Sequence, residues 1–163
     1  MRILLAALMF IGGIMAAEAQ TKVYGVDVLR TGTYKVGKSK EIDNPDISTG
    51  HRYEARVTLI RRTTTIPAKA GVSFGLDIMI RGRPRGKVVP FRIVWRYPAP
   101  GLRNPDTGKT KLVDDYIDQK ALDERTSFFW QLGEEWVAVP GVWTFEIWYE
   151  GRKLAKQSFT LVR

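Results

Sequence analysis

Four positive charges lie within one seven-residue segment, 81–87, which reads Arg-Gly-Arg-Pro-Arg-Gly-Lys. The charged members are Arg81, Arg83, Arg85 and Lys87. Arginine side chains held this close together can bind phosphate or carboxylate groups through paired hydrogen bonds. Arg96, on the outer face of the strand expected to follow, would add another cation. The segment therefore predicts a site for an anionic polymer or a lipid headgroup. The alternative is a solvated turn that prevents edge-to-edge aggregation.

The same segment contains the Arg-Gly-Arg-Pro core of an AT-hook, an extended peptide whose arginines enter the minor groove of A·T-rich DNA. An AT-hook works as a free segment, whereas this one is expected to join two strands. The N-terminus also has the features of an export signal, which would remove the protein from the chromosome. We therefore expect no specific nucleic acid partner.

Few residues of this chain could carry catalysis or hold a metal. There is no cysteine and only one histidine, His51, so a thiolate zinc site, an iron-sulfur cluster and a cysteine nucleophile are excluded. Adjacent carboxylates occur at 114–115 and 134–135. Neighbours in a strand point to opposite faces, so adjacency does not provide the facing pair that a glycosidase needs. We predict a protein without enzymatic activity or cofactor, and keep a small glycan-directed hydrolase as the rival.

Trp148 is the remaining candidate for a binding residue. The strand pairing described below places its indole on the outer face of a sheet, across from Leu154. An exposed indole beside an apolar neighbour can stack on a sugar or dock a partner. The alternative is that a loop or the N-terminal segment covers it.

Residues 1–19 have the features of a cleaved secretory signal peptide. Arg2 provides a positive start, residues 3–15 are almost entirely apolar, and Ala17-Glu18-Ala19 fits the small-x-small rule for cleavage. The apolar run is shorter than the roughly 20 residues that span a bilayer, and no later segment is apolar enough. We predict a mature chain that begins at Gln20, without a transmembrane segment, in the periplasm or outside the cell.

The mature part, residues 20–163, is predicted to be one domain with a strongly basic surface. Of the 163 residues in the chain, 44% are apolar and 26% are charged, which is enough to fill a core and cover it. The net charge is +9. Residues 1–19 contain one cation and one anion, so this charge belongs entirely to the mature chain.

Apolar residues alternate with polar ones over most of the mature chain, which is typical of half-buried strands. Two such rows consist of Val72, Phe74, Leu76, Ile78 and Ile80, and of Val89, Phe91, Ile93, Trp95 and Tyr97. They predict a hairpin in which Ile80 faces Val89. This register also sets Asp77 opposite Arg92, a favourable pair of charges.

A second hairpin is predicted at the C-terminus, around the turn 150–152. Its register pairs Trp143 with Phe159, Glu146 with Lys156 and Tyr149 with Lys153, because a slip of one residue would set aromatic residues against polar ones.

The spacing of apolar residues near 114–123 is closer to that of a helical face and indicates a short helix, with Asp114 as its cap. Six to eight strands at this spacing predict an all-β, two-layer sandwich.

Two segments resemble a family of bacterial domains of unknown function whose members are often exported. One is Trp-Val-Ala-Val-Pro-Gly-Val-Trp-Thr-Phe-Glu-Ile-Trp-Tyr-Glu-Gly-Arg-Lys-Leu at 136–154, followed by Ser-Phe-Thr-Leu at 158–161. The other runs from Ile66-Pro67-Ala68 through Gly71 to Phe74-Gly75. The resemblance implies an immunoglobulin-like sandwich and brings no catalytic or binding residues with it.

Together these features predict an exported, non-catalytic binding or interaction module of the bacterial cell envelope. Its expected partner is an envelope protein or, if the segment 81–87 is functional, an anionic polymer.

Overall fold

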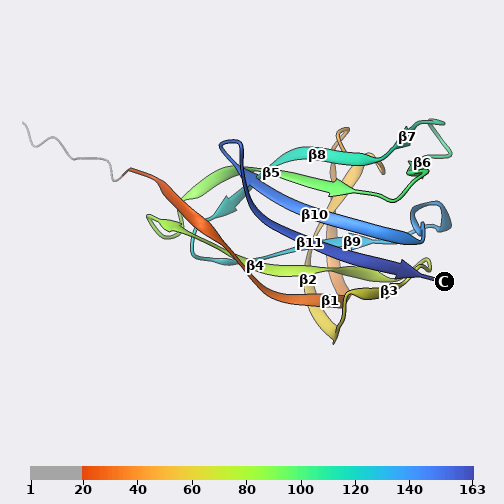
Figure 1. The fold of residues 1–163 in the computed structure, drawn as a ribbon, viewed down its shortest axis with the longest axis horizontal. Helices are drawn as coiled ribbons and strands as arrows, with labels where there is room; N and C mark the ends of the chain where they lie inside the picture. Colours follow the sequence, from red (N-terminus) through yellow and green to blue (C-terminus); the bar gives the residue numbers. More distant parts are fainter. Residues whose placement is uncertain (1–19) are drawn as a thin grey trace, which may run out of the picture.

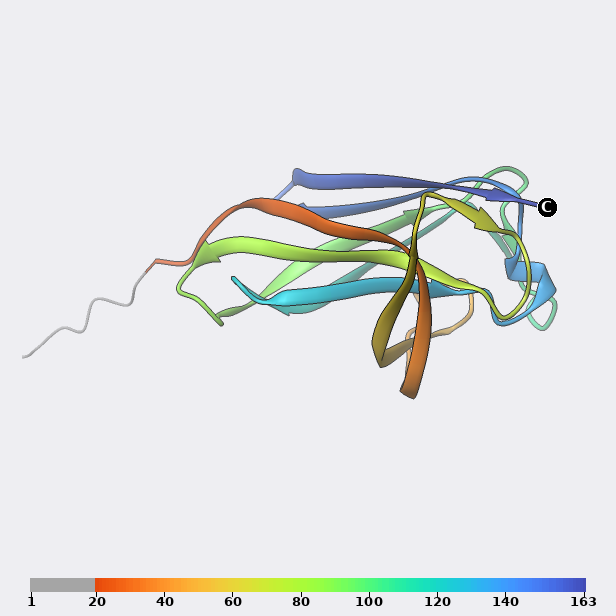
Figure 2. The same ribbon diagram turned by 90° about the horizontal axis from the view of Figure 1, so that it is seen from below.

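The computed structural model describes residues 20–163, which form two β-sheets packed face to face (Figures 1 and 2). The predicted signal peptide, 1–19, lies outside the described residues. Sheet A has the order β2-β1-β4-β9, from β1 (Lys22–Asp43), β2 (His51–Arg62), β4 (Ser73–Arg83) and β9 (Arg125–Gln131). Sheet B has the order β3-β11-β10-β5-β8, from β3 (Thr65–Pro67), β5 (Val88–Arg96), β8 (Val113–Ala121), β10 (Gly141–Tyr149) and β11 (Arg152–Val162).

Two short elements complete the described chain. β6 (Leu102–Arg103) and β7 (Thr110–Lys111) pair with each other beyond the end of β5, and η1 (Glu135–Val137) is a single 3-10 turn that precedes β10. Within residues 20–163, no helix has the length and apolar character needed to cross a membrane.

The core lies between the sheets and is rich in aromatic residues. Phe74 of β4 packs edge-on against Trp95 of β5 and Trp143 of β10, with ring centroids 6.1 and 5.6 Å apart. All three side chains are almost fully buried. Edge-to-face pairs of this kind stabilise a core by about 0.5–1.5 kcal/mol each beyond the burial of their area. The alternating rows identified in the sequence therefore point inward, as expected.

The predicted hairpin between residues 72–80 and 89–97 is wrong, because β4 and β5 belong to different sheets. β4 pairs with β1 and β9, while β5 pairs with β10 and β8. The two apolar rows face each other across the core instead of lying side by side. Alternation fixes which side of a strand points inward, but either arrangement buries both rows, so the pattern does not select the neighbour.

The expected pair of Asp77 and Arg92 depends on that hairpin and is wrong as well. Asp77 binds Arg30 and Arg125 within sheet A, and Arg92 binds Asp115 of β8. Each charge has found an opposite charge on a strand that is its neighbour in the sheet.

The predicted C-terminal hairpin is confirmed from Trp143–Phe159 to Ile147–Ala155 and is wrong at its tip. A bulge after Ile147 shifts the register by one residue, so that Tyr149 lies opposite Arg152 and not Lys153. The turn explains the shift. Glu150 and Gly151 have positive φ angles of 46° and 75°, as in the two-residue turns that join twisted strands most tightly.

The segment expected to form a short helix is β8. Its inward positions carry Asp114, Tyr116 and Asp118, which are buried, and its outward positions include Ile117, which is 62% exposed. A helix near residues 114–123 is therefore wrong. In an ordinary edge strand the inward side chains are apolar and the outward ones polar. In β8 two inward side chains are carboxylates and one outward side chain is isoleucine, so the sequence does not show the usual alternation.

β1 is long because it pairs with two different strands along its length. Its first half pairs with β4 up to Thr33, and from Gly32 onward it pairs with β2. There is no room for a side chain at this junction, since a Cβ added to Gly32 would lie 1.9 Å from the Arg61 carbonyl oxygen. Beyond it, residues 33–62 form a two-stranded ribbon that bends away from β4 and β9 and crosses to β8 (Figures 1 and 2). We call residues 33–62 the strap.

Candidate functional site

The strap crosses a cleft between the open edges of the two sheets. Among the described residues, β9 pairs only with β4 and β8 pairs only with β5, so each presents one free edge on this side of the sandwich. The cleft has a volume of about 580 Å³. Its walls come from β8, β9, the strap, and the loop and 3-10 turn that follow β9.

The free edge of β9 runs along the cleft, because all seven residues from Arg125 to Gln131 line it. Leu132 donates its N–H to the carbonyl oxygen of Val72, which fixes the alternation of backbone groups along β9. Backbone groups of antiparallel strands point alternately toward and away from the partner strand. It follows that the N–H and C=O groups of Arg125, Ser127 and Phe129 point away from β4, into the open side. The N–H of Gln131 does so too, while its carbonyl oxygen accepts from Gly133.

Aromatic side chains form much of the apolar surface of the cleft. Those lining it include Trp95, Tyr116, Phe128, Trp130 and Trp136. The indole of Trp130 is only 7% exposed, and its buried Nε1–H has no hydrogen-bond acceptor among residues 20–163. A buried donor without an acceptor is destabilising by about 1–3 kcal/mol.

Charged groups tie the strap to β8 inside the cleft. Asp118 of β8 is nearly buried and binds Lys120 at 2.7 Å and Arg52 of the strap at 3.7 Å. Arg52 also lies 3.2 Å from Glu54. The Lys120 ammonium in turn lies 5.2 Å from the ring centroid of Phe128 on β9, a cation–π contact across the gap between the sheets.

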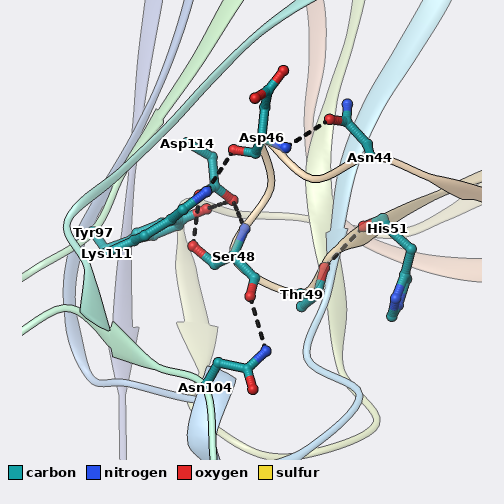
Figure 3. Close-up of polar contacts among 9 residues, drawn as sticks. All are labelled: Asn44, Asp46, Ser48, Thr49, His51, Tyr97, Asn104, Lys111 and Asp114. Atoms are coloured by element: carbon teal, nitrogen blue, oxygen red, sulfur yellow. Dashed lines mark hydrogen bonds and ion pairs between the residues drawn. The ribbon is translucent and has the colours of Figure 1, made fainter. Parts of the chain in front are cut away.

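The tip of the strap is held by the buried carboxylate of Asp114 (Figure 3). Ser48 donates its backbone N–H to Asp114 Oδ2 at 2.7 Å and its hydroxyl to Oδ1 at 2.5 Å. The Tyr97 hydroxyl donates to Oδ2 at 2.6 Å. Burial raises the pKa of Asp114, although the hydrogen bonds from Ser48 and Tyr97 act in the opposite direction. We call Ser48, Tyr97 and Asp114 the latch.

Two further contacts support the latch from neighbouring loops. Asn104 donates its amide N–H to the carbonyl oxygen of Ser48 at 3.2 Å, and Lys111 donates to the carbonyl oxygen of Asp46 at 2.9 Å (Figure 3). Ile47, beside Ser48, is 5% exposed and joins the hydrophobic core. The tip of the strap is therefore docked on sheet B by both polar and apolar contacts.

The root of the strap is fixed by a second buried aspartate, Asp77. Its carboxylate accepts hydrogen bonds from Arg30 at 2.7 Å, Arg125 at 2.5 Å and Ser127 at 2.6 Å. Tyr34 is buried next to this group. Desolvation, together with the nearby negative charge of Asp77, raises the pKa of Tyr34 to about 12.

The predicted basic site is only partly assembled. Arg81 binds Asp27 at 2.7 Å, whereas Arg83, Arg85 and Lys87 are exposed and have no carboxylate within 4.0 Å in the described part of the chain. Arg96 lies at the far end of β5, about 30 Å away at about 3.3 Å per residue, and is 3.6 Å from Glu146. The structure thus brings Arg83, Arg85 and Lys87 together and leaves Arg96 outside the group.

Trp148 lies on the outer face of sheet B, half-buried between two cations. Lys153 and Arg92 are 4.8 and 5.7 Å from the ring centroid, and its Nε1–H donates to Glu146 at 3.0 Å. Neither a loop nor the N-terminal segment is needed to explain its partial burial. These neighbouring side chains occupy positions that a stacked sugar would need.

Sequence reasoning did not identify the cleft or the latch. His51 lines the cleft and lies 3.6 Å from Glu41. The sequence pattern around Asp114 indicates a helix cap and half of an adjacent pair of carboxylates, and neither describes its place in the structure. The feature of the sequence that could have indicated the latch is an aspartate at an inward position of an alternating row, two residues before Tyr116. A buried carboxylate requires hydrogen-bond donors from elsewhere in the chain.

Comparison with known proteins shows which fold and which family this chain has. The chain resembles an immunoglobulin-like protein from Pseudomonas aeruginosa whose crystal structure is known, with a TM-score of 0.59 and 22% sequence identity over 90% of this chain and 100% of that one. At this identity the likeness concerns the fold alone. No curated protein matches the chain. The model of the family described as domain of unknown function DUF3859 matches residues 22–161. The resemblance inferred from the two segments is thereby confirmed: the chain folds as an immunoglobulin-like β-sandwich and belongs to the DUF3859 family.

Proposed function

We propose that this protein is a non-catalytic binding module, exported to the cell envelope, that captures an extended segment of a partner protein along the free edge of β9. The observation that carries the proposal is the run of seven consecutive residues of an edge strand, Arg125–Gln131, along one cleft. An edge strand with unpaired backbone groups is a template for another strand. Addition of a peptide strand to such an edge is a common mode of recognition.

The side chains around the edge support an occupant with alternating apolar residues. Successive side chains of an added strand would point alternately inward and outward. The inward ones would meet the aromatic lining. The strap, fixed at its root and its tip, would limit access to a single extended segment.

The charges in the cleft favour binding over hydrolysis. The cleft contains four carboxylates, from Glu54, Asp106, Asp118 and Glu134. Asp118 is bound by Lys120 and Arg52, and Glu54 is bound by Arg52. Two of the four carboxylates are thus held in ion pairs, whereas a glycosidase needs two carboxyl groups that face the substrate from opposite sides of the scissile bond.

The proposal can be tested by selecting peptides from a random 12-residue library against purified residues 20–163. We expect bound peptides with alternating apolar residues, and slower amide hydrogen exchange at Arg125, Ser127 and Phe129 when they bind. Failure to select any peptide, or protection confined to another part of the molecule, would contradict strand addition at β9.

A pair of variants at Phe129 separates the backbone from the side chain. Phe129→Pro removes the outward N–H, and Phe129→Ala keeps it while removing the ring. We expect the proline variant to lose at least tenfold in affinity relative to the alanine variant, with both checked for folding by circular dichroism. Equal affinities would show that the backbone edge does not carry binding.

Export is tested separately, by fractionating cells that express the full chain. The expected product is periplasmic or extracellular protein with the mass of a chain that begins at Gln20. Retention of the uncleaved chain in the cytoplasm would contradict the export part of the proposal.

A second candidate function is binding of an anionic polymer or lipid headgroup by the turn between β4 and β5. The supporting observation is that Arg83, Arg85 and Lys87 are exposed and without an ion-pair partner among the described residues. Retention on an immobilised polyanion should then fall in the double variant Arg83→Ala, Arg85→Ala, and unchanged retention would remove this candidate.

A further inference from the structure

The strap carries an unusual concentration of unpaired positive charge. Six of its basic side chains are exposed and have no carboxylate within 4.0 Å in the part of the chain that the structure describes: Lys35, Lys38, Lys40, Arg56, Arg61 and Arg62. The two glutamates of the strap lie nearer its tip, where Glu41 is 3.6 Å from His51 and Glu54 is 3.2 Å from Arg52. The half of the strap near its root is therefore almost purely cationic.

The cations follow the length of the ribbon. Lys35 lies opposite Thr58, and Thr33 lies opposite Arg61, so the basic side chains come from both strands of the same stretch. At about 3.3 Å per residue, Lys35 and Lys40 are on the order of 15 Å apart.

Four of these cations share one face of the ribbon: Lys35, Lys40, Arg56 and Arg61. Arg62 points to the other face, because neighbours in a strand alternate. A linear chain lying along the first face would meet its four charges in succession.

We propose that the outer side of the strap binds a linear acidic polysaccharide. Proteins that hold single-stranded nucleic acids combine cations with aromatic platforms for the bases. The tyrosines of the strap, Tyr34 and Tyr53, are buried and half-buried and offer no such platform. Binding to a lipid surface uses a broad apolar face beside the cations, and here Ile60 is the one large apolar side chain among the strongly exposed residues of the strap.

This site is independent of the peptide cleft and of the turn between β4 and β5. The cleft is lined by residues near the tip of the strap, from Ile47 to Ala55, whereas the unpaired cations include none of these residues. The cations on the turn lie at one end of β4. The strap begins at the other end of β4, where Thr33 pairs with Phe74. Variants of the three regions can therefore be compared directly.

Two triple variants with the same change in net charge provide the test. One is Lys35→Gln, Lys38→Gln, Arg56→Gln on the strap, and the other is Arg83→Gln, Arg85→Gln, Lys87→Gln on the turn. Binding of residues 20–163 to heparin and to alginate is measured by titration at several salt concentrations. Each contact with the polymer steepens the dependence of affinity on salt, because it releases counterions.

We expect the strap variant to bind both polysaccharides about tenfold more weakly at 100 mM salt, with a salt dependence shallower by about two charges. The turn variant should lose less than about twofold, a result that would also remove the turn as the second candidate site. Equal losses would mean that only net charge matters, and a loss confined to the turn variant would move the site there. Either result overturns the proposal, provided that both variants melt within a few degrees of the unaltered protein.

Two competitors check the class of ligand. Duplex DNA should displace heparin no better than its charge alone predicts, and vesicles containing anionic lipid should not retain the protein when heparin is present. Preferential displacement by DNA, or retention on vesicles that heparin does not reverse, would overturn the assignment to a polysaccharide.

Discussion

Ser48 donates two hydrogen bonds to the carboxylate of Asp114, at 2.7 and 2.5 Å, although 66 residues separate them in the chain. Asp114 belongs to the edge strand of sheet B, and Ser48 is at the tip of a ribbon that departs from sheet A. This one carboxylate thus joins the two sheets across the cleft. The shape of the cleft depends on it, because it holds the strap in place.

Removal of the Asp114 carboxylate should destabilise the protein strongly. Asp114→Ala leaves the hydroxyls of Ser48 and Tyr97 and one backbone N–H without their acceptor in a buried site. Loss of such a network is expected to lower the free energy of unfolding by about 2–4 kcal/mol. The measurement is urea denaturation monitored by tryptophan fluorescence.

The adjacent residue provides the matched control. Asp115 has the same chemistry, points outward and binds the exposed Arg92. Asp115→Ala should lower the free energy of unfolding by less than about 1 kcal/mol, as is usual for surface ion pairs. Similar losses in the two variants would contradict the assignment of Asp114 as the latch.

The two aspartates should affect the pH dependence of stability in opposite directions. Burial raises the pKa of Asp114 above its usual value of 3.8, so its contribution to stability is fully present below pH 3.8 and is lost as the pH rises through its folded-state pKa. The hydrogen bond from Arg92 lowers the pKa of Asp115. Its contribution is therefore present above pH 3.8 and is lost as the pH falls.

Urea denaturation between pH 2.5 and 6 separates these contributions. The difference in unfolding free energy between the unaltered protein and Asp114→Asn should shrink as the pH rises from 3.5. The corresponding difference for Asp115→Asn should grow as the pH rises from 2.5. If both differences change in the same direction, the burial of Asp114 does not govern its ionisation.

The junction between the strap and sheet A should not tolerate a side chain. A Cβ at Gly32 would lie 1.9 Å from a backbone oxygen, so Gly32→Ala must push β1 and β2 apart. We expect a loss of about 3 kcal/mol in unfolding free energy. Gly25, in the same strand, has no atom within 4 Å of an added Cβ, so Gly25→Ala should be nearly neutral. A neutral Gly32→Ala variant would show that the strap can shift without loss of packing.

The register of the last hairpin shows how far local patterns reach. Pairing of Trp143 with Phe159 and of Glu146 with Lys156 could be predicted, because only this register sets apolar side chains against each other. The ion pairs that Glu146 forms could not be predicted in this way. Its carboxylate lies 2.8 Å from Lys153, beyond a bulge, and 3.6 Å from Arg96 on the next strand. A bulge depends on the turn that closes the hairpin, and the next strand is chosen by the packing of the whole sheet.

The sequence by itself determined which side chains are inward, since alternation in rows such as those of Phe74 and Phe91 has one buried face whichever strands are neighbours. Only the tertiary structure decided that these rows lie in opposite sheets, because either arrangement removes the same apolar surface from water. It also decided the candidate site. The carboxylate of Asp114 can be buried only where Ser48 and Tyr97 supply donors, and those donors are brought to it by the path of the strap across the cleft.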